Sequence, residues 1–85
     1  MNKITAAAAN HEEAARKLNR EVARVFKPGT QVRVAIGNAN VEGVVISTSD
    51  HWWNPGIVYI TNTATGKRRK FDAPYKIGKN NVEVI

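Results

Sequence analysis

The hydrophobic pattern changes its period once, at Lys27-Pro28-Gly29, and this change divides the chain into two kinds of structure. Before it, apolar residues recur about every 3.6 positions, as in an amphipathic helix. After it, apolar and polar residues alternate, as in strands that are buried on one face. Proline disfavours helical geometry at the preceding residue, and the glycine completes the break. We therefore expect an α+β fold, mainly β. An N-terminal helix in residues 1–27 and a β domain in residues 28–85 should form one compact unit.

The predicted helix spans residues 10–26 and has one apolar stripe, formed by Ala14, Ala15, Leu18, Val22, Val25 and Phe26. Asn10, with Glu13 three residues later, fits an N-cap with a capping-box partner, and that start would leave the first residues disordered. Thr5 is the rival start, because the alanines at 6–9 are strong helix formers. The sequence leaves both starts open.

Five short strands are predicted after the helix, in residues 31–36, 41–48, 57–61, 67–71 and 82–85. Gly43 interrupts the second strand, where we expect a bulge or a close approach of another backbone. Residues 72–76 fit one irregular or 3₁₀ turn. Five short strands with regularly spaced turns favour a small closed barrel, because closure removes exposed strand edges.

Part of the β domain resembles a known group of small barrels. Pro28-Gly29-Thr30-Gln31-Val32-Arg33-Val34, followed by Gly37 and then by Val41-Glu42-Gly43-Val44-Val45, resembles the KOW and Tudor group with the Src-homology-3-like fold. The resemblance covers residues 28–45 and implies a five-stranded Src-homology-3-like barrel. Members of this fold group commonly bind nucleic acid, ribosomal components, proline-rich or methylated peptides, or partner proteins, so the resemblance implies a fold more than a ligand. The loop with the two tryptophans departs from the KOW pattern, and no Tudor aromatic cage can be assigned residue by residue.

Composition narrows the classes of function. Among 85 residues, 13 Lys and Arg stand against 7 Asp and Glu, which gives a net charge of +6. Residues 11–27 hold five basic and three acidic residues, and residues 67–85 hold six basic and two acidic ones, whereas the middle is almost uncharged. This bipolar positive charge indicates a polyanionic partner. The absence of cysteine excludes disulfides, thiolate metal sites and a cysteine nucleophile.

Basic residues follow one face of the predicted helix, at Arg16, Arg20, Arg24 and Lys27. Acidic residues one helical turn away can form ion pairs with two of these residues and with the neighbouring Lys17. The pairs are Glu12 with Arg16, Glu21 with Arg24, and Glu13 with Lys17. Arg20 has no acidic neighbour on the helix. This face is either a solvated surface or a stripe for phosphates or an acidic partner. A membrane-surface helix is disfavoured, because the apolar face is narrow and rich in alanine.

The densest charge is the run Lys67-Arg68-Arg69-Lys70. Strand alternation puts Arg68 and Lys70 on one face and Lys67 and Arg69 on the same face as Phe71, which should point inward. Inward charges fit only where the hairpin projects beyond the core, so the run predicts a protruding basic hairpin suited to phosphates. The alternative is an edge strand that its charges protect from aggregation.

Trp52 and Trp53 lie in a predicted loop, residues 51–56. A domain of this size needs large apolar anchors, so we expect at least one of them in the core. An exposed tryptophan could stack a base or anchor a protein partner.

The sequence contains few residues that could form a catalytic site. Ser49-Asp50-His51 contains the residue types of a triad, but consecutive residues cannot converge in that geometry. With two histidines and no clustered carboxylates, we expect no enzyme, metal or cofactor.

The leading interpretation is a cytoplasmic, non-catalytic protein that binds DNA or RNA, mainly through phosphates and with weak sequence specificity. The chain lacks the long apolar run of a membrane span and the pattern of a signal peptide. Phosphates would be held by the basic residues of the helix and of the hairpin. The alternative is a protein-interaction module or small inhibitor that docks on an acidic protein through the loop with Trp52 and Trp53.

Overall fold

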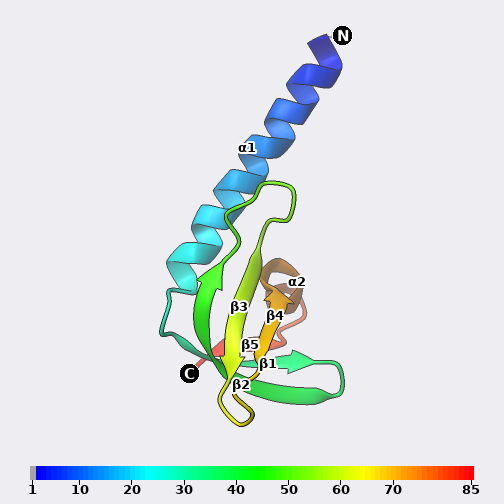
Figure 1. Ribbon diagram of the computed structural model, residues 1–85. Helices are drawn as coiled ribbons and strands as arrows, with labels where there is room; N and C mark the ends of the chain where they lie inside the picture. Colours follow the sequence, from blue (N-terminus) through cyan, green and yellow to red (C-terminus); the bar gives the residue numbers. More distant parts are fainter. Residues whose placement is uncertain (1) are drawn as a thin grey trace.

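The computed structural model describes the backbone of residues 2–85 and the side chains of residues 11–85. It is an α+β protein with more strand than helix in the β domain (Figure 1). Its elements are α1 (Asn2–Val25), β1 (Gln31–Ile36), β2 (Ala39–Thr48), β3 (Ile57–Asn62), β4 (Arg68–Asp72), α2 (Ala73–Gly78) and β5 (Val82–Val84). All neighbouring strands are antiparallel, and their order in the sheet is β4-β3-β2-β1-β5. The predicted helix and all five predicted strands are thus present.

The sheet is open, so the expected closed barrel is wrong. β4 and β5 form its two edges, and α2 contacts both of them. α2 replaces the predicted irregular turn because its start is well capped: Asp72 accepts a hydrogen bond from the Tyr75 N–H at 3.2 Å, and Pro74 lies in the first turn. The chain between the two edge strands is therefore folded into a helix that contacts both edges, and β4 and β5 do not pair with each other.

The core lies between the inner face of the sheet and the C-terminal part of α1. The rings of Phe26, just after α1, and Phe71 on β4 meet edge to face with their centroids 5.7 Å apart. Alternate residues of the strands and one face of α1 surround them, and the buried cluster contains Val22, Phe26, Val32, Val34, Val41, Val45, Val58, Ile60, Phe71 and Ala73. These residues bury the apolar positions that the alternating pattern predicted.

The buried face of α1 is rotated from the predicted stripe. Ala15, Leu18, Val22 and Phe26 face the core as predicted, but Ala14 and Val25 are exposed. A polar residue, Asn19, is buried instead, with 8% of its surface exposed.

Both predicted helix starts are wrong, because α1 begins at Asn2 and continues through Thr5 and Asn10. The alanine-rich segment has strong helix propensity and lengthens the helix toward the N-terminus. The predicted end before Pro28 is confirmed.

Gly43 and the bulge of β2 lie at different places. The register between β2 and β3 shifts at Ile46, between Val45 and Ser47, so a bulge at Gly43 is wrong. The predicted close approach is confirmed, because a Cβ atom on Gly43 would lie 2.8 Å from the Thr61 carbonyl oxygen.

Candidate nucleic-acid interface

The hairpin basic residues, Lys67, Arg68, Arg69 and Lys70, lie on β4 and on the turn that leads into it. All four are exposed, while the next residue, Phe71, is buried in the core as predicted. Arg69 pairs with buried Ile60 across the ladder but remains exposed itself. None of the ion pairs among residues 11–85 involves a hairpin basic residue.

Tyr59 on β3 completes this surface, although the sequence analysis did not single it out. Lys70 is its partner across the ladder, and the Arg68 guanidinium carbon lies 4.9 Å from the centre of the Tyr59 ring. These three side chains and Arg69 line a shallow cavity of about 270 Å³. The sequence signal for Tyr59 was the alternation along β3. Tyr59 lies between Val58 and Ile60, which face inward, so its own side chain belongs to the opposite face.

The backbone of β4 also supports the alternative interpretation, a protected edge. Asn62 donates its N–H to the Lys67 carbonyl, which sets the phase of the ladder between β3 and β4. Alternation along an antiparallel ladder then leaves the backbone groups of Arg68 and Lys70 on the open side of β4. Charged side chains at these positions hinder another strand from pairing there.

The helix basic residues, Arg16, Arg20, Arg24 and Lys27, are all exposed. Two of the predicted pairs are confirmed: Glu12 with Arg16 at 2.7 Å, and Glu21 with Arg24. The predicted pair of Glu13 with Lys17 is not formed. Among the described side chains, Arg20 has no acidic partner in an ion pair. Arg16 and Arg20 line a groove of about 310 Å³ between α1 and the end of β2, whose far side includes Asp50.

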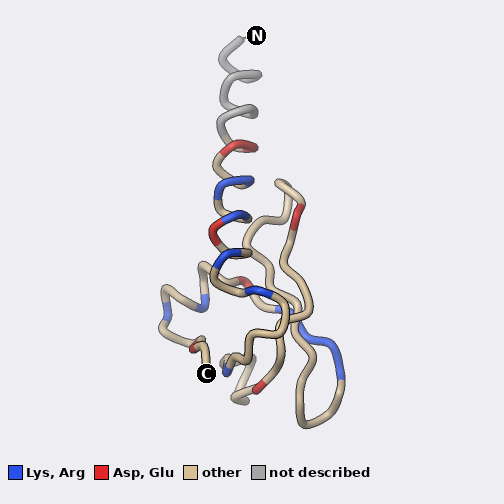
Figure 2. The backbone as a smooth tube through the Cα atoms, turned by 90° about the vertical axis from the view of Figure 1, so that its left-hand side faces the viewer, with Lys and Arg blue, Asp and Glu red and all other residues tan. Residues whose placement is uncertain are grey.

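The helix and the hairpin basic residues occupy separate parts of the surface. Figure 2 shows them as two blue stretches, one along α1 and one along β4. α1 packs beside β2, whereas β4 lies beyond β3 at the edge of the sheet. A third stretch, Lys76 in α2 and Lys79 at its C-cap, lies within 6 Å of the Tyr75 ring centre, at 5.8 and 5.9 Å. A nucleic-acid backbone that runs along β4 therefore does not at the same time contact the basic residues of the helix.

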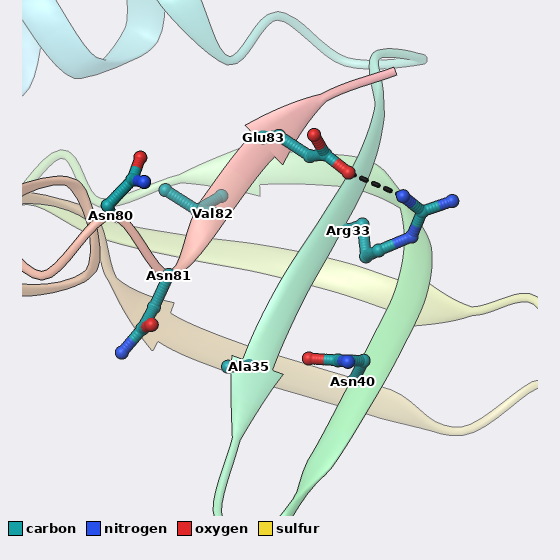
Figure 3. A pocket seen from close by; sticks show the side chains of 7 residues that line it. All are labelled: Arg33, Ala35, Asn40, Asn80, Asn81, Val82 and Glu83. Carbon is teal, nitrogen blue, oxygen red and sulfur yellow. Dashed lines mark hydrogen bonds and ion pairs between the residues drawn. The ribbon is translucent and has the colours of Figure 1, made fainter.

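Arg33 is occupied by acidic partners. Its guanidinium donates to Glu42 at 2.8 and 3.0 Å and also to Glu83 on β5. The hydrogen bond and charge of Glu42, followed by those of Glu83, raise the pKa of Arg33 above its usual value. Arg33 borders a polar cavity of about 280 Å³ between β1, β2 and β5 (Figure 3). Because Glu42 and Glu83 already compensate the charge of Arg33, this cavity is a poor site for an anion.

Neither tryptophan lies in the core, so that expectation is wrong. Phe26 and Phe71 supply the large anchors instead. Trp53 is 66% exposed, and the ring of His51 stacks on it at 4.4 Å with an interplanar angle of 12°. Trp52 is half-buried and packs edge-on against Trp53 at 6.1 Å and against His11 of α1 at 6.2 Å.

Hydrogen bonds hold the tryptophan loop, residues 49–56, against α1. The Asn19 Nδ2 donates to the His51 carbonyl at 3.1 Å, and its Oδ1 accepts from the Gly56 N–H at 2.8 Å. Inside the loop, the Ser49 hydroxyl donates to the Asn54 carbonyl at 2.6 Å. Asn19 is not among the predicted site residues, and its signal in the sequence is a polar residue in the midst of an apolar helix face.

Comparisons of the chain with models of protein families, with curated protein sequences and with solved structures find no match. Within the described part of the chain, no group of three or more His, Cys, Asp or Glu side chains is arranged to hold a metal ion. The same part contains no helix long and apolar enough to cross a membrane. Charge and geometry are therefore the basis for a functional assignment.

Proposed function

We propose that the protein is a small, non-catalytic nucleic-acid-binding protein that contacts phosphates through the hairpin basic residues. One observation carries this proposal. Four consecutive basic side chains are exposed and form no ion pair with any described acidic residue. Arg16, Arg24 and Arg33, by contrast, are each bound by glutamate. Lys76 and Lys79 also lie outside these ion pairs, but the densest uncompensated charge of the β domain is the run of four hairpin basic residues.

Arg68 is suited to a phosphate. A guanidinium presents its N–H groups in a plane and can bind two phosphate oxygens at once. Its position over Tyr59 already restricts the arginine, so less side-chain freedom is lost on binding. Edge protection alone requires charge on β4, but it does not require an arginine ordered over an aromatic ring. Contacts of this kind carry little sequence information, so we expect weak specificity.

The finer fold assignment is also a proposal: a Src-homology-3-like architecture related to the KOW and Tudor group. The antiparallel order β4-β3-β2-β1-β5 and the short helix before the last strand support it. Nucleic-acid binding is one of the roles that this fold group commonly has, so the two proposals agree without depending on each other.

Fluorescence anisotropy with a labelled single strand and a labelled duplex, across a salt series, tests the function. The logarithm of the affinity should fall against the logarithm of the salt concentration by about 0.7 per contacted phosphate for a single strand and about 0.9 for a duplex. The double variant Arg68→Ala, Lys70→Ala should bind more weakly and show a flatter slope. The control Lys76→Ala, Lys79→Ala removes the same charge from α2 and should retain most of the affinity. Absence of binding at low salt, or a hairpin variant with unchanged affinity and slope, would contradict the proposal.

The exposure of Trp53 favours a second candidate, a protein-interaction module that docks on an acidic partner. In that case Trp53→Ala should cost about 2 kcal/mol or more in binding to the partner, while the hairpin charges should mainly change the association rate. The absorbance of the purified protein separates the candidates. Bound nucleic acid raises the ratio of absorbance at 260 and 280 nm, and a high-salt wash should lower it.

A further inference from the structure

We propose that Trp53 stacks on an unpaired nucleobase, so that the protein prefers single-stranded nucleic acid to a duplex. This inference rests on the proposed nucleic-acid binding and adds the class of ligand and a second contact site. It starts from Trp53 in the tryptophan loop, a residue that is 66% exposed.

The loop presents this ring on an ordered support. Asn19 is buried in the helix face and binds both His51 and Gly56, and Ser49 is buried and binds Asn54. Among the described side chains, every buried polar atom has a hydrogen-bond partner. A ring held in this way loses little conformational freedom when a ligand binds.

Trp53 keeps most of its surface exposed although two rings contact it. His51 covers one face of Trp53 in a nearly parallel stack, and Trp52 meets it edge-on. A base placed against the exposed ring surface would extend the existing stack of His51 and Trp53. Only an unpaired base can do so at low cost, because the bases of a duplex are already stacked on each other and must be extruded first.

Positive charge lies beside the loop. The groove between α1 and β2 is lined by Ser49 and Asp50 from the start of the loop and by Arg16 and Arg20 from the helix. Arg16 is bound to Glu12, and Asp50 lies 3.4 Å from the Nε2 of His51. Arg20 has no ion-pair partner among the described side chains, so its guanidinium is available to a phosphate of the same nucleic-acid strand.

The surroundings of Trp53 favour a base over a protein partner. A tryptophan that anchors a protein interface lies in the apolar, fully desolvated centre of that interface. Along the loop, Trp53 lies next to Trp52 and close to Pro55, and its other near neighbours, Asp50, His51 and Asn54, are polar. Most of the other exposed large apolar side chains belong to the end of α1, to α2 and to the C-terminal segment, at Val25, Tyr75, Ile77, Val84 and Ile85.

The experiment compares a single-stranded oligonucleotide with a duplex of the same sequence. Trp52→Phe leaves Trp53 as the only tryptophan, and its fluorescence should be quenched by the single strand and much less by the duplex. Trp53→Ala should weaken single-strand binding about fivefold or more, as loss of one stacked base does, and leave duplex affinity unchanged. Trp53→Phe, which keeps a smaller ring, should lie between the two.

The possible outcomes are distinct. If the Trp53→Ala protein binds the single strand and the duplex as tightly as the original protein does, or loses affinity for both by the same factor, the inference is wrong while the proposed function stands. If the Trp52→Phe protein binds the single strand but its Trp53 fluorescence is not quenched, the inference is also wrong. This fluorescence measurement tests the inference even if the Trp53→Ala protein does not fold. If the original protein binds neither ligand, the proposed function fails and this inference fails with it, leaving Trp53 to the protein-anchor interpretation.

Discussion

The Asn19 side chain accepts a hydrogen bond of 2.8 Å from the backbone N–H of Gly56, 37 residues further along the chain. The Gly56 carbonyl in turn accepts from the Ala73 N–H at 2.8 Å. Gly56 has a positive φ of 78°, and a Cβ atom there would lie 2.8 Å from the Pro74 Cδ. This one residue therefore connects α1, the tryptophan loop and α2, and only glycine fits.

Asn19→Ala should lower the free energy of unfolding by about 2 kcal/mol or more, because it leaves the Gly56 N–H and the His51 carbonyl without their partner. Urea denaturation followed by circular dichroism measures the change. Asn40→Ala, at an exposed position of β2, is the control and should stay within about 0.5 kcal/mol of the original protein. Equal stability of the two variants would show that water replaces the Asn19 hydrogen bonds without cost.

Gly56→Ala should be more destabilising than Gly66→Ala. Both glycines have positive φ, so each alanine carries about 1–2 kcal/mol of left-handed strain. A Cβ atom on Gly66 meets nothing within 4 Å, whereas that on Gly56 collides with Pro74, which adds about 1–3 kcal/mol of overpacking. Thermal unfolding of the two variants side by side isolates the steric part. Similar melting temperatures would mean that Pro74 moves aside freely.

Tyr59→Leu should weaken nucleic-acid binding severalfold, because Arg68 loses the ring that orients it. Tyr75→Leu is the matched control, since the Tyr75 ring also has basic side chains nearby but lies on α2. The affinities come from anisotropy at fixed salt, after circular dichroism has shown that both variants are folded. A Tyr59→Leu protein with full affinity would leave Arg68 as an edge charge only.

Arg20→Glu tests the helix basic residues. The new carboxylate can reach Arg16 and Arg24 one turn away, but it also faces Asp50 across the groove, so we expect stability within about 0.5 kcal/mol of the original. Single-strand affinity should fall severalfold. Lys79→Glu makes the same charge change on α2 and should have a smaller effect. If both variants lose affinity equally, the effect is one of net charge rather than of a contact at Arg20.

The features that the sequence determined by itself are those set by local spacing. The break at Pro28 and Gly29, the alternation in the strands and the inward position of Phe71 follow from backbone geometry over a few residues. The pairs of Glu12 with Arg16 and of Glu21 with Arg24 follow from the helical repeat. The hairpin basic residues could be identified from the sequence for the same reason, because both the density of charge and the position in a strand are properties of a few consecutive residues.

Only the tertiary structure decided the features that depend on distant residues. Asn19 replaces Val25 on the buried face of α1 because the tryptophan loop, more than thirty residues away, offers it two hydrogen-bond partners. Trp53 stays outside because Phe26 and Phe71 already fill the core, and Arg33 is neutralised by Glu83 from the last strand. The two edge strands, β4 and β5, do not pair with each other, and α2 contacts both of them. Each of these outcomes is a competition among side chains for the same space or the same hydrogen bond, and local spacing does not show which side chains compete.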